Sequence, residues 1–289
     1  MNALYALAYI ILAPLIGGLL VGMDRRITAR MQGRVGPPLL QPFYDVLKLF
    51  EKEKVVVTRS QNFYILCYLV FMVFTGALFF AGGDILLVVF ALTLAHIFLI
   101  LGAYAANSPY SYIGAERELI QVMAFEPMII LTTVGLYMAT KSFYVTDIAA
   151  TATPLVAYLP GIFLGLAYVL TIKLRKSPFD LSTSHHAHQE LVKGVTTEFS
   201  SSTLGRIEIT HWYETVLLLG IIYLFVGSSS PAGIAIGIAA VLFIYLLEIF
   251  VDNNYPRVKW QMLMNTSWTI AVILGLLNLG ALYYIAGVQ

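Results

Sequence analysis

The chain has 289 residues, of which 59% are hydrophobic and 11% are charged. Soluble domains carry about 25% charged residues, so this composition excludes an ordinary soluble protein. The 17 basic residues nearly balance the 16 acidic ones. Because nucleic-acid-binding proteins carry a clear basic excess, no nucleic-acid partner is expected. A single cysteine, Cys67, can form neither an intrachain disulfide nor a four-cysteine iron–sulfur site. Any redox centre that this protein serves is therefore expected on another chain.

Eight apolar runs have the length and composition of transmembrane helices, which need about 20 apolar residues to cross the hydrocarbon core. They cover residues 3–23, 63–81, 85–106, 119–138, 155–172, 212–227, 232–251 and 262–285. We therefore predict an all-α membrane protein with eight transmembrane helices. No boundary divides residues 1–289 into more than one polytopic domain.

The basic residues give the predicted helices an orientation. With eight crossings, every Lys and Arg except Lys141 falls on one side of the membrane. Basic loops stay in the cytoplasm, so both termini are predicted to be extracytoplasmic, in a multi-pass protein of the cytoplasmic membrane. The two long loops, residues 24–61 and 173–211, then lie on the cytoplasmic side, where we expect them to dock soluble subunits.

The first long loop combines basic residues with an amphipathic segment. Four of its arginines stand close to Gly and Pro residues: Arg25, Arg26, Arg30 and Arg34. Pro42 suits the first turn of a helix. Apolar residues then recur at i, i+3, i+4 and i+7: Phe43, Val46, Leu47 and Phe50. This spacing predicts an amphipathic helix at the membrane surface. The arginines are candidates for partner docking, and attraction to anionic lipid is the alternative explanation.

Acidic residues inside predicted membrane helices are functional candidates, because an ionisable group is costly there. Glu126 lies within the fourth predicted helix and is followed by Pro127, which favours a kink. Glu118 lies eight residues earlier, about two turns away, so the two carboxylates are predicted to share a helix face and to relay protons. The alternative is an ion pair with Arg117 or Arg34 that stabilises the bundle.

Two further polar residues lie in predicted membrane helices. Glu248, near the cytoplasmic end of the seventh helix, is either a residue of ion coupling or an interface residue whose carboxylate reaches the membrane surface. His96, in the third helix, is expected to be a hydrogen-bonded residue of the bundle rather than a metal ligand.

The second long loop concentrates titratable side chains. Three histidines lie within four positions and three carboxylates flank them: His185, His186, His188, Asp180, Glu190 and Glu198. Histidine titrates near physiological pH, so the loop is predicted to pass protons or to switch with protonation. Metal binding is the alternative. Because adjacent histidines point in different directions on a helix and no cysteine assists, no metal site is expected.

Three segments resemble the complex I subunit 1 family, the membrane subunits that join the redox arm of complex I to its membrane arm. They are residues 30–37 with the Leu-Gln-Pro of 40–42, residues 114–127, and residues 178–200, in the family's order over nearly the whole chain. Quinone-reducing members carry two glutamates soon after the Pro-Phe-Asp-Leu of 178–181. Here Ser, Thr and the histidines stand in those places. That difference and the shorter chain resemble the membrane anchors of energy-converting [NiFe] hydrogenases of the Ech and formate-hydrogenlyase type.

The resemblance implies a membrane anchor and ion-translocation coupling subunit of a ferredoxin-dependent energy-converting hydrogenase. The implied partners are a [NiFe] hydrogenase large subunit, an iron–sulfur small subunit, a ferredoxin-like subunit, an antiporter-like membrane subunit and lipid. The nickel–iron centre and iron–sulfur clusters would lie on those partners, with no cofactor and no catalytic residue on this chain.

Three alternatives stay open. The first is a quinone-reducing heel subunit of complex I, and the second is a ferredoxin-oxidising complex that reduces something other than protons. The third is a stand-alone secondary transporter, although such proteins usually carry an internal repeat and none is visible here.

Overall fold

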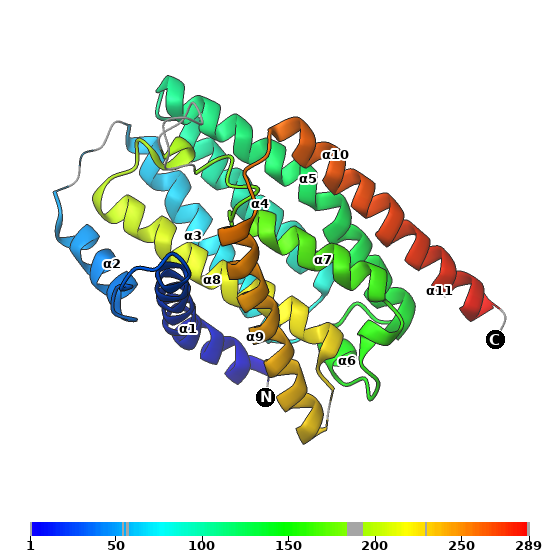
Figure 1. Cartoon of the computed structure of the whole chain (residues 1–289). Helices are drawn as coiled ribbons and strands as arrows, with labels where there is room; N and C mark the ends of the chain where they lie inside the picture. The colour runs from blue at the N-terminus through cyan, green and yellow to red at the C-terminus, as the bar shows by residue number, and fades with distance from the viewer. Residues whose placement is uncertain (1, 54, 56–57, 184–192, 229, 288–289) are drawn as a thin grey trace.

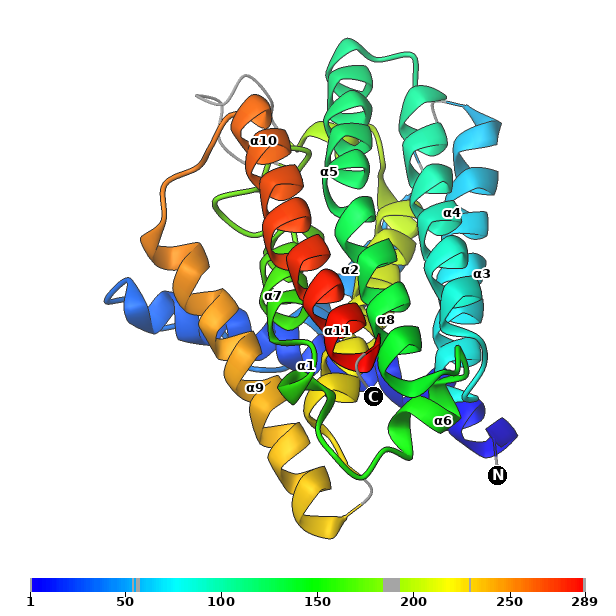
Figure 2. The ribbon, with the colours of Figure 1, turned by 90° about the vertical axis from the view of Figure 1, so that its right-hand side faces the viewer.

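The computed structural model describes residues 2–53, 55, 58–183, 193–228 and 230–287, and within them the protein is a bundle of helices (Figure 1). The long helices are α1 (Asn2–Met31), α3 (Arg59–Phe80), α4 (Ile85–Tyr104), α5 (Pro109–Thr140), α8 (Ser201–Val226) and α9 (Pro231–Asn254). Shorter helices are α2 (Gln41–Glu51), α6 (Val145–Ala149) and α7 (Pro160–Lys173). After α9 the chain forms a continuous helical rod beside α5 (Figures 1 and 2). The rod consists of α10 (Trp260–Ile270), the π-helical η4 (Ala271–Leu276) and α11 (Leu277–Gly287).

Seven helices of the described residues are long and apolar enough to cross a membrane: the six long helices and the rod, over Trp260–Tyr284. The predicted all-α membrane fold is therefore confirmed. The predicted segment 155–172 differs, since it contains the 3-10 turn η1 (Leu155–Ala157) and α7, a helix of only 14 residues. At 1.5 Å per residue α7 is about 21 Å long, shorter than the hydrocarbon core.

Prolines and a polar cap determine where several helices begin. Pro109, Pro160 and Pro231 are the first residues of α5, α7 and α9. Proline suits this position because its missing N–H would have no partner within the helix. Asp84 caps α4 by accepting a hydrogen bond from the backbone N–H of Leu86 over 2.8 Å.

Helix α1 is longer than the sequence predicts. It continues to Met31, beyond the predicted end at residue 23. The chain turns at Gly33, whose φ of 72° is a backbone conformation that favours glycine. Arg25, Arg26 and Arg30 consequently stand on the last turns of a helix rather than in a loop.

Helix α8 is the centre of the bundle. In its most apolar window 67% of the residues are buried, against 56% for α4 and α5 and 22% for α1 and the rod. It packs against α1, α2, α3 and α9, and Figure 2 shows α9 leaning away from the other helices. Side chains on α8 thus lie where protein surrounds them, and charged groups there are shielded from lipid.

The predicted amphipathic helix forms as α2, with Pro42 in its first turn. Val46 is buried, and Phe43 lies against Gly18 of α1, where a larger residue would clash. Leu47 and Phe50 stay exposed. The apolar stripe is therefore divided between the protein and the exterior, as expected for a helix at a membrane surface.

Candidate functional site

Six titratable side chains meet in the interior between α4, α5, α7 and α8. We call them the interior charge cluster: His96, Glu118, Lys173, Arg175, His211 and Glu214. The relative exposure of His96, Glu118, Lys173 and Glu214 is between 1% and 4%. Because an isolated buried charge is strongly destabilising, groups at this depth must be paired.

Arg175 is the central cation of the cluster. Its Nη2 lies 2.6 Å from Oε1 of Glu118 on α5. Its Nη1 lies 3.0 Å from Nε2 of His211 and 3.7 Å from Oε2 of Glu214, both on α8. A guanidinium can only donate hydrogen bonds, so Nε2 of His211 accepts and the imidazole is neutral, with its hydrogen on Nδ1. Arg175 thus joins α5 to α8 through one side chain.

Glu214 is surrounded by basic side chains from three elements. Nε2 of His96 on α4 lies 2.8 Å from Oε1 of Glu214. Nζ of Lys173, the last residue of α7, lies 3.5 Å from the same oxygen and 3.8 Å from the centroid of the Phe125 ring. Together with Arg175, these contacts place both carboxylate oxygens of Glu214 in ionic contact despite their burial.

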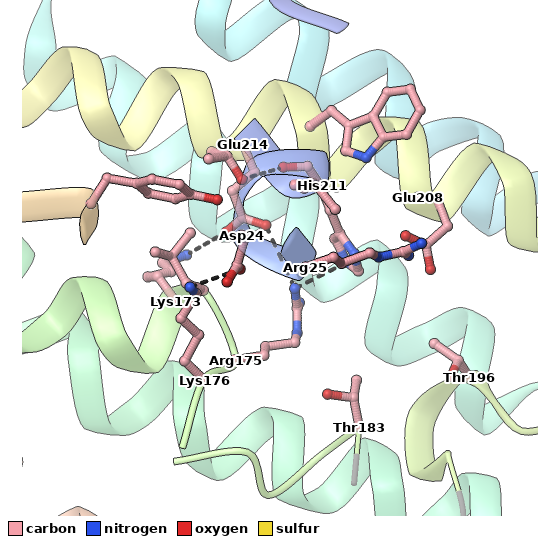
Figure 3. A pocket seen from close by; sticks show the side chains of 15 residues that line it. Asp24, Arg25, Lys173, Arg175, Lys176, Thr183, Thr196, Glu208, His211 and Glu214 are labelled. Carbon is pink, nitrogen blue, oxygen red and sulfur yellow. Dashed lines mark hydrogen bonds and ion pairs between the residues drawn. The ribbon is translucent and has the colours of Figure 1, made fainter. Parts of the chain in front are cut away.

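A polar cavity of about 280 Å³ lies beside the cluster (Figure 3). Its lining includes four cluster residues and polar residues from α1, α8, α9 and the segment after α7: Lys173, Arg175, His211, Glu214, Asp24, Arg25, Lys176, Glu208 and Tyr245. Nζ of Lys176 lies 2.8 Å from Oδ2 of Asp24, which ties the segment after α7 to α1. With this lining and size, the cavity can hold hydrogen-bonded water next to the charge cluster.

Hydrogen bonds and an ion pair connect the Pro-Phe-Asp-Leu segment and the preceding Ser177 to α5, to α9 and to Arg257. Nε2 of Gln121 on α5 donates to the carbonyl oxygen of Phe179 over 2.6 Å. The backbone N–H of Ser177 donates to Oδ1 of Asp252 on α9 over 2.8 Å. Nη2 of Arg257, a residue that precedes α10, lies 2.6 Å from Oδ2 of Asp180. Burial raises the pKa of Asp180 to about 6, although the Arg257 guanidinium favours the ionised form.

Glu118 and Glu126 do not share an environment, so the predicted common face is wrong. Glu118 belongs to the cluster and pairs with Arg175, not with the predicted Arg117 or Arg34. Glu126 is half-buried in an apolar groove between α5 and the rod, beside Trp268. Eight residues rotate a helix by two turns and about 80° more, which separates the two side chains.

The other predicted coupling residues lie in separate places. Glu248 is 1% exposed on α9, with Lys176 and Asp252 as its charged neighbours, so it does not reach the membrane surface. Glu198 is half-buried in a small pocket near the start of α3. The remaining four fall outside the described residues: His185, His186, His188 and Glu190.

The four arginines proposed for docking are exposed: Arg25, Arg26, Arg30 and Arg34. Nη1 of Arg25 lies 2.6 Å from Oδ2 of Asp45 and so joins α1 to α2. Arg34 donates a hydrogen bond to Gln32. Both contacts are at the surface.

Sequence reasoning missed most of the interior charge cluster. His211 and Glu214 recur at i and i+3 on a helix, but the predicted span began at residue 212 and left His211 in a loop. Lys173 and Arg175 served only to orient the chain. The available signal was the combination of titratable residues at 208, 211 and 214 with a basic run directly after an apolar helix.

Within the ranges that the structure describes, no three His, Cys, Asp or Glu side chains come together as a metal-binding group. In the cluster, Lys173 and Arg175 supply the positive charge beside the carboxylates. The donor set of the cluster therefore suits ion pairing and proton exchange.

Fold and site together define a polytopic helical membrane protein with a buried ionic network beside a polar cavity. A family profile described as NADH dehydrogenase matches residues 4–283, and the chain belongs to this family.

Relatives include components of hydrogenase and quinone-reducing complexes. Hydrogenase-4 component C of Escherichia coli is 26% identical over 295 residues, covering 92% of this chain and 91% of that protein. An NADH-quinone oxidoreductase subunit of Dehalococcoides mccartyi is 29% identical over 288 residues, covering 90% and 80%. A chain of the archaeal membrane-bound sulfane sulfur reductase, a respiratory membrane complex, has the same fold, with a TM-score of 0.85 at 24% identity over 96% of this chain and 99% of that chain. The predicted family resemblance is confirmed: this is a complex I-like membrane protein.

Proposed function

We propose that this chain is the membrane anchor and ion-translocation coupling subunit of a ferredoxin-dependent energy-converting [NiFe] hydrogenase complex. The observation that carries the proposal is the interior charge cluster, which links α4, α5, α7 and α8 and adjoins a polar cavity. The replacement of two glutamates after Pro-Phe-Asp-Leu favours a hydrogenase over a quinone-reducing complex, and Hydrogenase-4 component C is among the relatives that match over nearly the whole chain.

The proposed topology has eight crossings, with α7 as the short eighth segment embedded among α5, α8 and α9. Both termini would lie outside the cytoplasm, in a single domain in the cytoplasmic membrane. The loops 24–61 and 173–211 would dock the [NiFe] large subunit, the iron–sulfur small subunit and the ferredoxin-like subunit, with the exposed arginines of α1 contributing charge. All redox centres would lie on these partners.

The cluster gives the proposed coupling a physical basis. Arg175 contacts both Glu118 and Glu214, so protonation of either carboxylate weakens one contact of the guanidinium and strengthens its interaction with the other. A shift of the segment after α7, caused by a redox event in a docked subunit, would therefore change where protons reside in the cluster. Coupling of this kind needs one element that both sites bias, and Arg175 is the candidate.

The remaining predicted acids complete the proposed path. Asp180, Glu198 and Glu248 would carry protons between the second long loop and the cluster, and Glu126 faces the groove by the rod, where an antiporter-like subunit would pack. The histidines 185, 186 and 188 with Glu190 would exchange protons between the loop and water.

Purification of the native complex through a tag on this chain tests the assignment. We expect soluble subunits to co-purify, nickel to be present in stoichiometric amount, and reduced ferredoxin to drive hydrogen evolution. A nickel-free complex that reduces quinone and is inhibited by quinone-site ligands would replace this assignment with the quinone-reducing one.

A further inference from the structure

His96 is sealed inside the bundle. It is 1% exposed on α4, and the rings of Tyr68 on α3 and Phe125 on α5 lie edge-on at 6.1 Å and 6.0 Å between centroids. No bulk water reaches the imidazole, so its protonation is determined by the groups that contact it.

Both ring nitrogens of His96 face hydrogen-bond acceptors. Nδ1 lies 2.8 Å from the carbonyl oxygen of Leu92, which can only accept, so Nδ1 carries a hydrogen. Nε2 lies 2.8 Å from Oε1 of Glu214. If Glu214 is ionised, Nε2 must also carry a hydrogen and His96 is an imidazolium. If Nε2 carries none, Glu214 must be protonated and donate to it. In either case one hydrogen lies between the two groups.

Lys173 does not supply that hydrogen. Its Nζ is almost equally far from both ring nitrogens of His96, 3.4 Å from Nδ1 and 3.3 Å from Nε2. An ammonium on the in-plane axis of Nε2 would be much closer to Nε2 than to Nδ1. The axis of Nε2 is left to Glu214, and Lys173 acts as a neighbouring charge.

The charge balance around the pair favours a proton that can leave. The groups that face His96 and Glu214 come from four helices and one connecting segment: Tyr68 from α3, Glu118 from α5, Lys173 from α7, Arg175 from the segment after α7, and His211 from α8. With His96 charged, three cations oppose two carboxylates. When the shared proton has left, two cations oppose two carboxylates and the charges balance.

We propose that His96 and Glu214 share one transferable proton, which makes His96 a proton-holding residue of the ion-coupling path; the path itself rests on the proposed function. Glu214 lines the polar cavity and His96 lies behind it. When the pair has released its proton, Glu214 is ionised and Nε2 carries no hydrogen, and a proton arriving from the cavity then binds Oε1 of Glu214. It reaches the imidazole when the O–H bond at Oε1 breaks and the N–H bond at Nε2 forms.

The shared proton can be measured without any assay of function. The complex is labelled with ¹⁵N-histidine, and nitrogen resonances and carboxyl infrared bands are recorded across the neutral pH range, with Glu214→Gln identifying the signals of the pair. We expect either an imidazolium signal from His96 or a protonated-carboxyl band from Glu214. A neutral His96 beside an ionised Glu214 in the resting complex, across the whole pH range recorded, overturns the proposal.

The second measurement is ion pumping by the complex in proteoliposomes. His96→Gln is expected to lower the number of ions moved per electron by about tenfold or more while redox turnover continues. The control Thr93→Ala, also on α4 and bonded only to its own helix, is expected to pump normally. Normal pumping by His96→Gln overturns the inference and leaves the proposed function intact. A wild-type complex that pumps no ions overturns the proposed function, while the spectra still decide where the proton lies.

Discussion

The Nη2 atom of Arg175 lies 2.6 Å from Oε1 of Glu118, and this buried ion pair joins the segment after α7 to α5. The same guanidinium also contacts His211 and Glu214 on α8. One side chain therefore holds three helices of the bundle in register, at the wall of the polar cavity. Both the stability of the bundle and the proposed coupling depend on this arrangement.

Arg175→Gln should destabilise the protein strongly, because it leaves Glu118 buried without its cation. The expected loss is about 3–5 kcal/mol of unfolding free energy. The control Arg25→Gln breaks an exposed pair with Asp45 and should cost at most about 1 kcal/mol. Thermal unfolding of the purified variants in detergent makes the comparison. Equal midpoints for the two variants would contradict the structural role given to Arg175.

Gly114→Ala should push α5 away from η3 (Gly194–Thr196). A Cβ atom at this position would meet the backbone of Gly194 and Val195, and overpacking against backbone costs about 1–3 kcal/mol. Gly280→Ala is the matched control, since no atom lies within 4 Å of the added carbon. Thermal midpoints should fall for the first variant only, and an unchanged midpoint for Gly114→Ala would show that η3 does not pack there.

Asp180 should make stability depend on pH in the acidic range. Its pKa is about 6, raised from the ordinary 3.8 by burial. Between these two values the folded protein binds more protons than the unfolded chain, so the contribution of Asp180 to stability falls as pH rises. The thermal midpoint of the wild type relative to Asp180→Asn should therefore decrease from about pH 4 to about pH 6 and then level off. A difference that does not vary with pH would rule out titration of this carboxyl.

Glu126 should be accessible from the membrane, unlike Glu118. A hydrophobic carbodiimide reacts with protonated carboxyls that it can reach, and Glu126 lines the open apolar groove by the rod. Mass spectrometry should find the adduct on Glu126 and none on Glu118, and reaction should decrease when the neighbouring membrane subunit is present. Glu126→Gln should abolish the adduct and impair pumping in the assembled complex. Labelling confined to Glu118 would contradict this placement.

Reversal of the basic surface at the end of α1 should weaken docking of the soluble subunits. Arg30→Glu combined with Arg34→Glu removes two exposed positive charges and adds two negative ones, so the recovery of soluble subunits on a tagged chain should fall. Added salt should also weaken docking of the wild type, because it screens the same charges. Lys141→Glu, which the predicted topology places on the opposite face, is the control. Equal recovery for both variants would mean that these arginines contact lipid instead.

Hydropathy and the residues that begin and end helices predicted much of the fold. Long apolar runs became the membrane-length helices, and Pro42 with the period of Phe43, Val46 and Phe50 predicted α2. The end of α1 was placed too early, because the arginines on its last turns are polar and yet continue the helix to Met31.

The site was harder to predict because its contacts are long-range. The spacing of Glu118 to the intramembrane Glu126 made it a candidate, but its partner Arg175 is 57 positions away and this pairing depends on how α5 and α7 pack. Glu214 is a single acid in an apolar window. Its role in the cluster depends on contacts with His96 and Lys173, which are distant in the sequence and come together only in the folded bundle. Glu126 lies on a different helix face from Glu118 because eight residues rotate a helix by about 80° beyond two full turns. The prediction of a common face treated eight residues as two whole turns.

In the proposed mechanism the interior charge cluster couples redox chemistry to ion movement. Ferredoxin-driven hydrogen evolution and ion uptake can be measured together, in proteoliposomes that carry the complex with Glu118→Gln or with the exposed control Glu116→Gln. We expect that both variants evolve hydrogen and that only Glu118→Gln loses ion uptake. Normal ion uptake by the assembled Glu118→Gln complex would contradict this coupling role.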